Sequence, residues 1–574
     1  MAGGDGDEQR LGIAQPAHDL TGAGDLLEDV ATRPALTTRL LDGIERFGNK
    51  MPSPAVLFLL LCLLTIALSQ VLFWFNVHAT FETVTPPPVP ATETYVGGSV
   101  EPSYVGPTQP EPADAYKLHT VTTKVQGLLT AHGVRYLFTS FVSNFREFAP
   151  LSIILVVMVG VGLAESAGLI GALIRKLVAI SSASMLTPII VLLGVFSSIA
   201  SDAGYLVLIP LGAAAFKSVG RHPLAGIAAA FAGVAAGFGV NFLITPLDAV
   251  LTEITNEAIG SATPRHIDLV SNLWFGIGST IFVVIVMTLV GHRFVEGRLG
   301  SYDPAVAGED PEDVDAPEVT PADEARGLRY ALWATLAVVA AITLLTVIPG
   351  APLRNPQTGE IIGDSPLMDS LIVIIAIIFF VAGWCYGKGA GTIRNSDAVL
   401  SAITKSWASL AGLLLLFLVI AQFIAYFNFS HIPDVAAVKL GDVLEHIHIG
   451  AVWLLIGVIL IAALANFVLP QAIGKWALLA PVFIPLFIRL GIAPQTVLAA
   501  FRVGDSPTNV ITPLNPYLAL VVIFARRYDK TSGIGTLIAM MLPYTIVLVV
   551  AWTLFFVAWY LIGIPLGPGW PVRV

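Results

Sequence analysis

The chain alternates long apolar runs with shorter polar segments. Many of the apolar runs reach 18 residues or more with few or no charged side chains. A helix needs about 20 apolar residues to cross the hydrocarbon core of a bilayer, so these runs predict membrane-spanning helices. The predicted spans are 55–75, 150–173, 224–247, 273–290, 330–347, 368–387, 406–427, 497–524 and 534–562.

Composition supports this interpretation. Of the 574 residues, 55% are hydrophobic and only 12% are charged, whereas soluble globular chains carry about 25% charged residues. We therefore predict an all-α polytopic membrane protein with about nine spans, surrounded by a lipid bilayer. The sequence has no basic patch that would indicate a nucleic-acid partner.

Two further apolar stretches are interrupted by polar residues near the middle. The first, 183–216, contains SSIASDAGY, and basic residues flank both of its ends (Arg175, Lys176, Lys217 and Arg221). Because lysine and arginine are retained on the cytoplasmic side, both ends face the same side, which predicts a re-entrant hairpin. The second stretch, 449–487, is interrupted at NFVLPQAIGKW and is predicted to enter from the opposite face.

The same rule orients the whole chain. The polar segment 1–50 lacks the apolar region of a secretory signal, and its basic residues Arg33, Arg39, Arg46 and Lys50 precede the first span. We expect a cytoplasmic N-terminus, a transporter domain over 51–563 in a bacterial-type inner (plasma) membrane, and a short external C-terminus over 564–574.

Two polar regions flank the early spans. The segment 76–120 is rich in proline and poor in lysine and arginine, so we expect an external loop without packed elements. An interfacial helix is expected over 120–147.

The two interrupted stretches are followed by similar sequences. IPLGAAAFKSVGRHPLAGIAAAF (209–231) parallels IPLFIRLGIAPQTVLAAF (484–501), and GVNFLITPLD (239–248) parallels TNVITPLN (508–515). Copies that enter from opposite faces form an inverted repeat, as in several secondary transporters. Glycine and proline in both copies are expected to break the helices near mid-membrane, where freed backbone groups can bind ions and anions. Close helix packing is the alternative explanation for these residues.

Few charged residues lie inside the predicted spans and hairpins, and such residues usually mark a pathway. Asp202 lies at the tip of the first hairpin, and Arg502 and Asp505 lie in span 497–524. Glu165 lies in span 150–173, and Asp248 lies near the end of span 224–247. Asp505, Asn509 and Asn466 offer oxygen ligands for a sodium ion, and Asp202 with Asn241 offers a mirror-related site. Proton coupling through Asp202 or Asp505 remains the alternative.

Two side chains have two interpretations each, and a third has one. Arg502 has a guanidinium suited to a substrate carboxylate, or it pairs with Asp505 three residues later. Trp476 stacks on an aromatic substrate or anchors at the membrane interface. Lys475 is expected to extend toward the interface.

The motifs SSIASDAGYLVLIPL, GKWALLAPVFIPL and RVGDSPTNVITPLNPY resemble the p-aminobenzoyl-glutamate transporter (AbgT) family of the ion-transporter superfamily. The resemblance implies a homodimer of independently working protomers, no cofactor beyond bound Na⁺, and p-aminobenzoyl-glutamate as substrate. It also implies proton-driven export of sulfonamide antimetabolites by some members.

Residue by residue, the resemblance implies substrate or gating roles for one set of positions and a sodium site for another. The first set is Asp202, Trp476, Pro494, Arg502, Asp505 and Pro513, and the second is Asn466, Asp505 and Asn509. The chain departs from the family at Ile473, where a small hydroxyl residue is common. An ion channel and an intramembrane enzyme are the rival classes, and no GxGD-like motif supports an enzyme.

Overall fold

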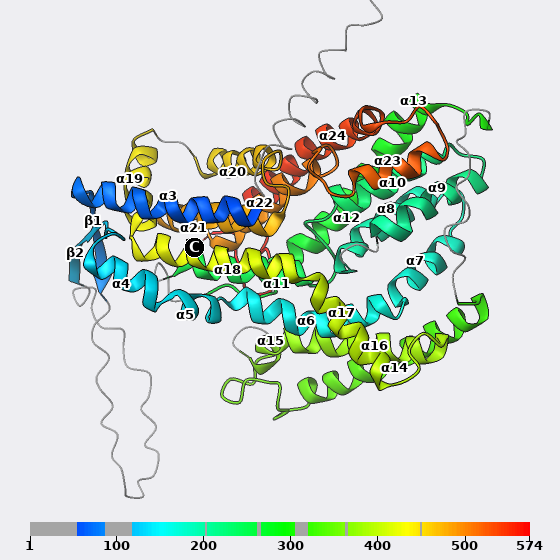
Figure 1. The fold of residues 1–574 in the computed structure, drawn as a ribbon, viewed down its shortest axis with the longest axis horizontal. Coiled ribbons are helices and arrows are strands. Elements are labelled where there is room, and N and C mark those ends of the chain that lie inside the picture. Colours follow the sequence, from blue (N-terminus) through cyan, green and yellow to red (C-terminus); the bar gives the residue numbers. More distant parts are fainter. Residues whose placement is uncertain are drawn as a thin grey trace, which may run out of the picture.

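The computed structural model describes residues 54–85, 117–200, 204–260, 266–304, 319–361, 365–447 and 450–573. Helices account for most of these residues, which confirms the all-α polytopic class (Figure 1). The helices before the first break are α3 (Pro54–Trp74), α4 (Ala131–Thr139), α5 (Phe141–Arg146), α6 (Ala149–Ser166), α7 (Leu169–Ala179), α8 (Leu186–Ser197), α9 (Ile209–Ser218) and α10 (Pro223–Phe231).

The helices from the first break to the second hairpin follow in order. They are α11 (Pro246–Ile259), α12 (Leu273–Val290), α13 (Gly297–Leu299), α14 (Pro321–Val347), α15 (Pro366–Asp369), α16 (Leu371–Ala390), α17 (Ser396–Ser409), α18 (Ala411–Phe429) and α19 (Ile432–Ile447). The second copy contains α20 (Ala451–Ala465), α21 (Ala472–Arg489), α22 (Pro494–Asp505), α23 (Leu518–Arg526) and α24 (Ile534–Ile562).

Within the described residues, eight helices are long and apolar enough to cross a membrane. Seven of them coincide with predicted spans. The eighth, α21, was predicted as one arm of the second hairpin. The predicted spans 224–247 and 497–524 are not continuous helices, because each is broken by a non-helical connection: α10 is separated from α11, and α22 from α23.

The two predicted hairpins each consist of two helices joined at a polar tip. The first comprises α8 and α9, with a 3-10 turn at Ser198–Ala200 and a π-helical turn at Gly204–Leu208 around the tip. The second comprises α20 and α21, joined through Asn466. Residues 201–203, which include Asp202, lie outside the described residues.

The region 76–120 contains structure that the sequence did not predict. Strands β1 (His78–Thr85) and β2 (Lys117–Lys124) form an antiparallel pair in which His78 lies opposite Lys124. The sheet packs through Ala79 against Val435 of α19, at one end of the molecule (Figure 1). The expectation that 76–120 contains no packed element was therefore wrong at its start, where β1 lies, and at its end, where β2 begins. The interfacial region contains two short helices, α4 and α5.

Two hydrophobic cores hold the helices together. The larger contains α8, α10, α11, α21, α22 and α24, which together surround the two breaks. The smaller joins α6, α7, α14, α16 and α17 along another side of the molecule (Figure 1). Helix α14 is largely exposed, with Trp333 at 70%, as expected for a surface that faces lipid or another protomer.

Candidate functional site

The candidate site lies where the two broken helices meet. In the first copy, α10 continues as one π-helical turn, Ala232–Ala236, and helical structure resumes only at Pro246. In the second copy, α22 ends in a 3-10 turn, Ser506–Thr508, and α23 begins at Leu518. Glycine and proline both weaken a regular helix, and helical structure is interrupted at both predicted breaks, which are therefore confirmed.

Backbone groups freed by the breaks bind side chains of the opposite copy. Asn509 Nδ2 donates to the Ala235 carbonyl at 3.2 Å, and Arg502 Nη1 donates to the Gly239 carbonyl at 3.1 Å. A Cβ atom added at Gly239 would lie only 2.2 Å from Ser506 Oγ. A residue with a Cβ atom at 239 would therefore require the Ser506 hydroxyl group to move.

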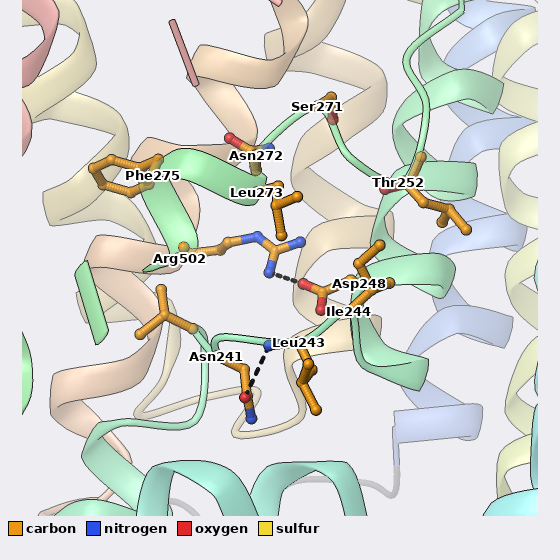
Figure 2. A pocket seen from close by; sticks show the side chains of 13 residues that line it. Asn241, Leu243, Ile244, Asp248, Thr252, Ser271, Asn272, Leu273, Phe275 and Arg502 are labelled. Atoms are coloured by element: carbon orange, nitrogen blue, oxygen red, sulfur yellow. Dashed lines mark hydrogen bonds and ion pairs between the residues drawn. The ribbon is translucent and has the colours of Figure 1, made fainter. Parts of the chain in front are cut away.

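Arg502 crosses a pocket to form an ion pair with Asp248, as Figure 2 shows. Asp248 also accepts hydrogen bonds from the Thr245 backbone N–H and hydroxyl group, and thereby caps α11. The interpretation of Arg502 as a partner of Asp505 is wrong, because the Arg502 guanidinium points toward the first copy instead.

The pocket contains polar atoms that no described residue binds. Arg502 Nε and both side-chain atoms of Asn272 are buried without a hydrogen-bond partner among the described residues. Asn241 also lines the pocket, but its amide is engaged: Nδ2 donates to the Val195 carbonyl (3.1 Å) and Ser198 Oγ (3.0 Å) of the first hairpin. The apolar wall includes Ile244, Leu273 and Phe275 (Figure 2). The pocket therefore combines a cation, unused hydrogen-bonding groups and an apolar surface.

A second polar cluster joins the tip of the second hairpin to α22. Asn466 Nδ2 lies within hydrogen-bonding distance of Asn509 Oδ1 (2.7 Å), Thr508 Oγ1 (2.8 Å) and the Asp505 carbonyl (3.0 Å). Lys475 Nζ donates to Asn466 Oδ1 at 2.7 Å and forms an ion pair with Asp505. The structure thus brings together Asn466, Asp505 and Asn509, the three predicted sodium ligands.

Lys475 differs from its prediction. Its side chain is fully buried and Asp505 is 2% exposed, so Lys475 does not extend to an interface. The reason is electrostatic: a charge buried away from water needs an opposite charge nearby, and Asp505 supplies it.

The residues of the predicted sodium site do not fit a metal ion in this conformation. Asn466 Oδ1 and Asp505 accept hydrogen bonds from the Lys475 ammonium, and Asn509 Oδ1 accepts one from the Asn466 amide. A sodium ion binds through oxygen lone pairs, and these hydrogen bonds direct N–H groups at the same oxygens.

The remaining predicted residues lie near the cluster or the pocket without lining the pocket. Trp476 is fully buried, donates to Thr255 Oγ1 at 2.9 Å and packs on Phe501 with ring centroids 4.6 Å apart. It is therefore not an interfacial anchor. Pro494 is the first residue of α22, at the end opposite Arg502, and Pro513 lies in the connection to α23.

From sequence, Lys475 was misinterpreted, Asn272 was missed, and Asp248 was selected as an intramembrane charge without its partner. The signal for Lys475 was present, since a lysine inside an apolar run beside a hairpin tip is costly without a carboxylate partner. The partner of Arg502, by contrast, is 254 residues away, and no local spacing indicates it.

Comparisons with known proteins agree on one family. The model of the AbgT transporter family matches residues 39–574. The chain is 31% identical over 532 residues to the p-aminobenzoyl-glutamate transport protein of Escherichia coli (strain K12), covering 92% of this chain and 96% of that protein.

Two solved structures have similar folds. The YdaH transporter of Alcanivorax borkumensis, described as having an unusual topology, is 40% identical with a TM-score of 0.79, over 90% of this chain and all of that one. MtrF of Neisseria gonorrhoeae, described as illuminating a class of antimetabolite efflux pumps, is 35% identical with a TM-score of 0.78, over 93% of this chain and all of that one.

Proposed function

Because the chain belongs to the AbgT transporter family, we propose that it is a secondary transporter of p-aminobenzoyl-glutamate or a related aromatic carboxylate, coupled to a cation gradient. The substrate class follows the E. coli relative. The protein is a multi-pass membrane protein. Its inner-membrane location with a cytoplasmic N-terminus, and a homodimer, are parts of the proposal.

The observation that supports this substrate class is the buried guanidinium of Arg502. Arginine presents parallel N–H donors that match a carboxylate, and Arg502 Nε is unused among the described residues. The glutamate part of the substrate carries two carboxylates, and one of these would replace Asp248 as partner of Arg502. The aromatic ring would then lie against apolar residues such as Phe275 and Leu273, which line the same pocket.

The charge of the substrate explains why coupling is needed. Moving a dianion inward against a potential of about 100 mV costs about 4.6 kcal/mol, at about 2.3 kcal/mol per charge. Cotransported cations must offset this cost. We propose that the cluster of Asn466, Lys475, Asp505 and Asn509 is the coupling site, because Arg502 and Asp505 lie one turn apart on α22.

The hairpins are proposed to move with the outer helices during alternating access. Asn241 ties the first hairpin to the first break through Ser198, and Asn466 ties the second hairpin to the second break. A change at either binding site can therefore be passed to a hairpin through a few hydrogen bonds.

Uptake of labelled p-aminobenzoyl-glutamate into proteoliposomes tests the proposal, with Na⁺ and pH gradients imposed separately. Arg502→Ala is expected to reduce substrate affinity by about 100-fold, as loss of a charge-assisted pair worth about 3 kcal/mol implies. Arg135→Ala, at an exposed arginine of α4, is the matched control. Unchanged affinity in Arg502→Ala would contradict the carboxylate-binding role.

Export of a sulfonamide-type antimetabolite is the second candidate. The similarity to MtrF, described among antimetabolite efflux pumps, favours it. A neutral drug carries no charge against the membrane potential, so proton antiport would suffice. Drug-dependent proton movement in the same proteoliposomes, without uptake of p-aminobenzoyl-glutamate, would support this candidate instead.

A further inference from the structure

We propose that Lys475 is a tethered cation: its ammonium takes the place that a sodium ion would occupy among Asn466, Asp505 and Asn509. The inference rests on the proposed function, because it concerns the cation of the coupling site. It goes further by naming a group of the protein itself as the resident cation. Free sodium is then not a ligand of this site while Lys475 is in place.

Each of the three predicted sodium ligands already accepts a hydrogen bond through a side-chain oxygen. The ammonium is bound by Asn466 Oδ1 at 2.7 Å and by the Asp505 carboxylate. Asn509 Oδ1 is bound by the Asn466 amide at 2.7 Å, and the same amide group also faces Thr508 Oγ1 and the Asp505 carbonyl. An N–H group therefore already takes one lone pair on Asn466 Oδ1, Asp505 Oδ1 and Asn509 Oδ1, and the Lys475 ammonium fills the position beside Asn466 and Asp505.

The charge balance leads to the same conclusion. Lys475 pairs with Asp505, and on the other side of α22 Arg502 pairs with Asp248. Each pair is neutral, and both are shielded from solvent except at Asp248, whose side chain is 19% exposed. A sodium ion added between them would be an uncompensated positive charge among buried side chains, which is strongly unfavourable. Sodium can enter only when the Lys475 ammonium leaves Asp505.

The position of Lys475 fits a role in the transport cycle. It lies in the first turn of α21, directly after the tip of the second hairpin, whereas Asp505 ends α22. The ammonium therefore holds the hairpin tip to the helix that carries Arg502. A buried ion pair adds little net stability compared with well-packed apolar residues. If the Lys475–Asp505 pair were purely structural, replacing Lys475 with an apolar residue would leave ion binding unchanged.

Equilibrium binding of ²²Na⁺ to the purified full-length protein in lipid nanodiscs tests the proposal. Wild type is expected to show no saturable sodium binding. Lys475→Met, which keeps the length of the side chain and removes the charge, is expected to gain one sodium site per protomer. Lys475→Arg keeps the charge and is the matched control, expected to resemble wild type.

A second substitution assigns the new site to these ligands. Asp505→Asn added to Lys475→Met should abolish the gained sodium binding, because the carboxylate is the charged ligand. If Lys475→Met does not purify as a folded protein, Lys475→Gln replaces it. Stoichiometric sodium binding by wild type would overturn the proposal, and so would a folded, neutral Lys475 variant that binds no sodium. The wild-type measurement requires no substitution.

Failure of the tethered-cation proposal can be distinguished from failure of the proposed transport function. Uptake of p-aminobenzoyl-glutamate by wild type that requires a sodium gradient would support the function and contradict the tethered cation. Absence of any uptake, together with a sodium site gained in Lys475→Met, would contradict only the substrate. Uptake that persists when choline replaces sodium would support both.

Discussion

At the scale of single residues, the site consists of two ion pairs. Each pair has one member on the short helix α22 and the other on a different helix. Arg502 and Asp505 are close enough in sequence to pair with each other, yet each binds a residue from elsewhere, Asp248 and Lys475. This arrangement leaves both charges exchangeable. We propose that a substrate carboxylate competes with Asp248, whereas the Lys475 ammonium keeps an external cation away from Asp505.

Asp248→Asn tests the first competition. The substitution removes the negative charge that holds Arg502 while retaining an oxygen that can accept from Thr245. Free Arg502 should bind substrate more tightly, and we expect the Michaelis constant for p-aminobenzoyl-glutamate uptake to fall by up to about tenfold, or about 1.4 kcal/mol.

Asp369→Asn, at an exposed aspartate of α15, controls for the general loss of one negative charge. A Michaelis constant that stays the same or rises in Asp248→Asn would show that Asp248 does not compete with substrate. Thermal melting of both variants checks that the cap of α11 is retained.

The sequence predicted some of these residues and not others for a physical reason. Charges inside apolar runs are conspicuous because burial is costly, so Arg502 and Asp505 could be selected, together with the polar residues Asn466 and Asn509. Which charges pair depends on contacts between distant segments. The separation between Arg502 and Asp248 is 254 residues, and local spacing favoured the wrong partner, Asp505.

At the scale of elements, long apolar helices were the most predictable part. Their length is set by the bilayer, so α3, α12 and α24 match predicted spans closely. The β1–β2 pair was missed because strand pairing such as His78 with Lys124 joins segments across a long insertion. The breaks after α10 and α22 were predicted from glycine and proline, but not how closely they approach each other.

Gly239→Ala tests whether this approach matters for transport. The added methyl group would lie 2.2 Å from Ser506 Oγ, with the Arg502 carbonyl at 3.3 Å. Either the Ser506 side chain must change its rotamer or the two connections must separate, and overpacking of this kind costs about 1–3 kcal/mol. We expect a large loss of transport rate with the protein still folded, measured as uptake per reconstituted molecule.

The double variant Gly239→Ala/Ser506→Ala is expected to recover part of that rate, because it removes the atom nearest the new methyl group. Gly457→Ala in α20 serves as the control, since nothing lies within 4 Å of the methyl group it would add. Equal activity of wild type and Gly239→Ala would show that close contact between the two breaks is dispensable.

At the scale of the whole molecule, the end of the chain supports the site. The segment 564–574 was expected to be a short external C-terminus, and its described residues pack against the start of α22 and the pocket wall. Gln495 donates to the Pro571 carbonyl at 2.7 Å, and Thr496 to the Val572 carbonyl at 2.8 Å. The Phe275 backbone N–H, in the pocket lining, donates to the Leu566 carbonyl at 3.0 Å.

Removal of residues 566–574 should therefore reach the pocket. The deletion exposes Gln495 and Thr496 and removes the acceptor of the Phe275 N–H, at about 1 kcal/mol per hydrogen bond. It also uncovers apolar surface at present covered by Leu566 and Val572, which are both buried. We expect a lower melting temperature in detergent and a several-fold weaker affinity for p-aminobenzoyl-glutamate.

Deletion of residues 1–38 is the matched control, because it removes more of the chain but lies outside the region that the family model matches. Comparing the two deletions shows whether the C-terminal segment specifically supports the fold or whether the protein is sensitive to any truncation. If both leave affinity and melting temperature unchanged, the C-terminal segment covers the helices without supporting the pocket. If only the C-terminal deletion weakens binding, the start of α22 must be fixed at one end for Arg502 to be held correctly at the other.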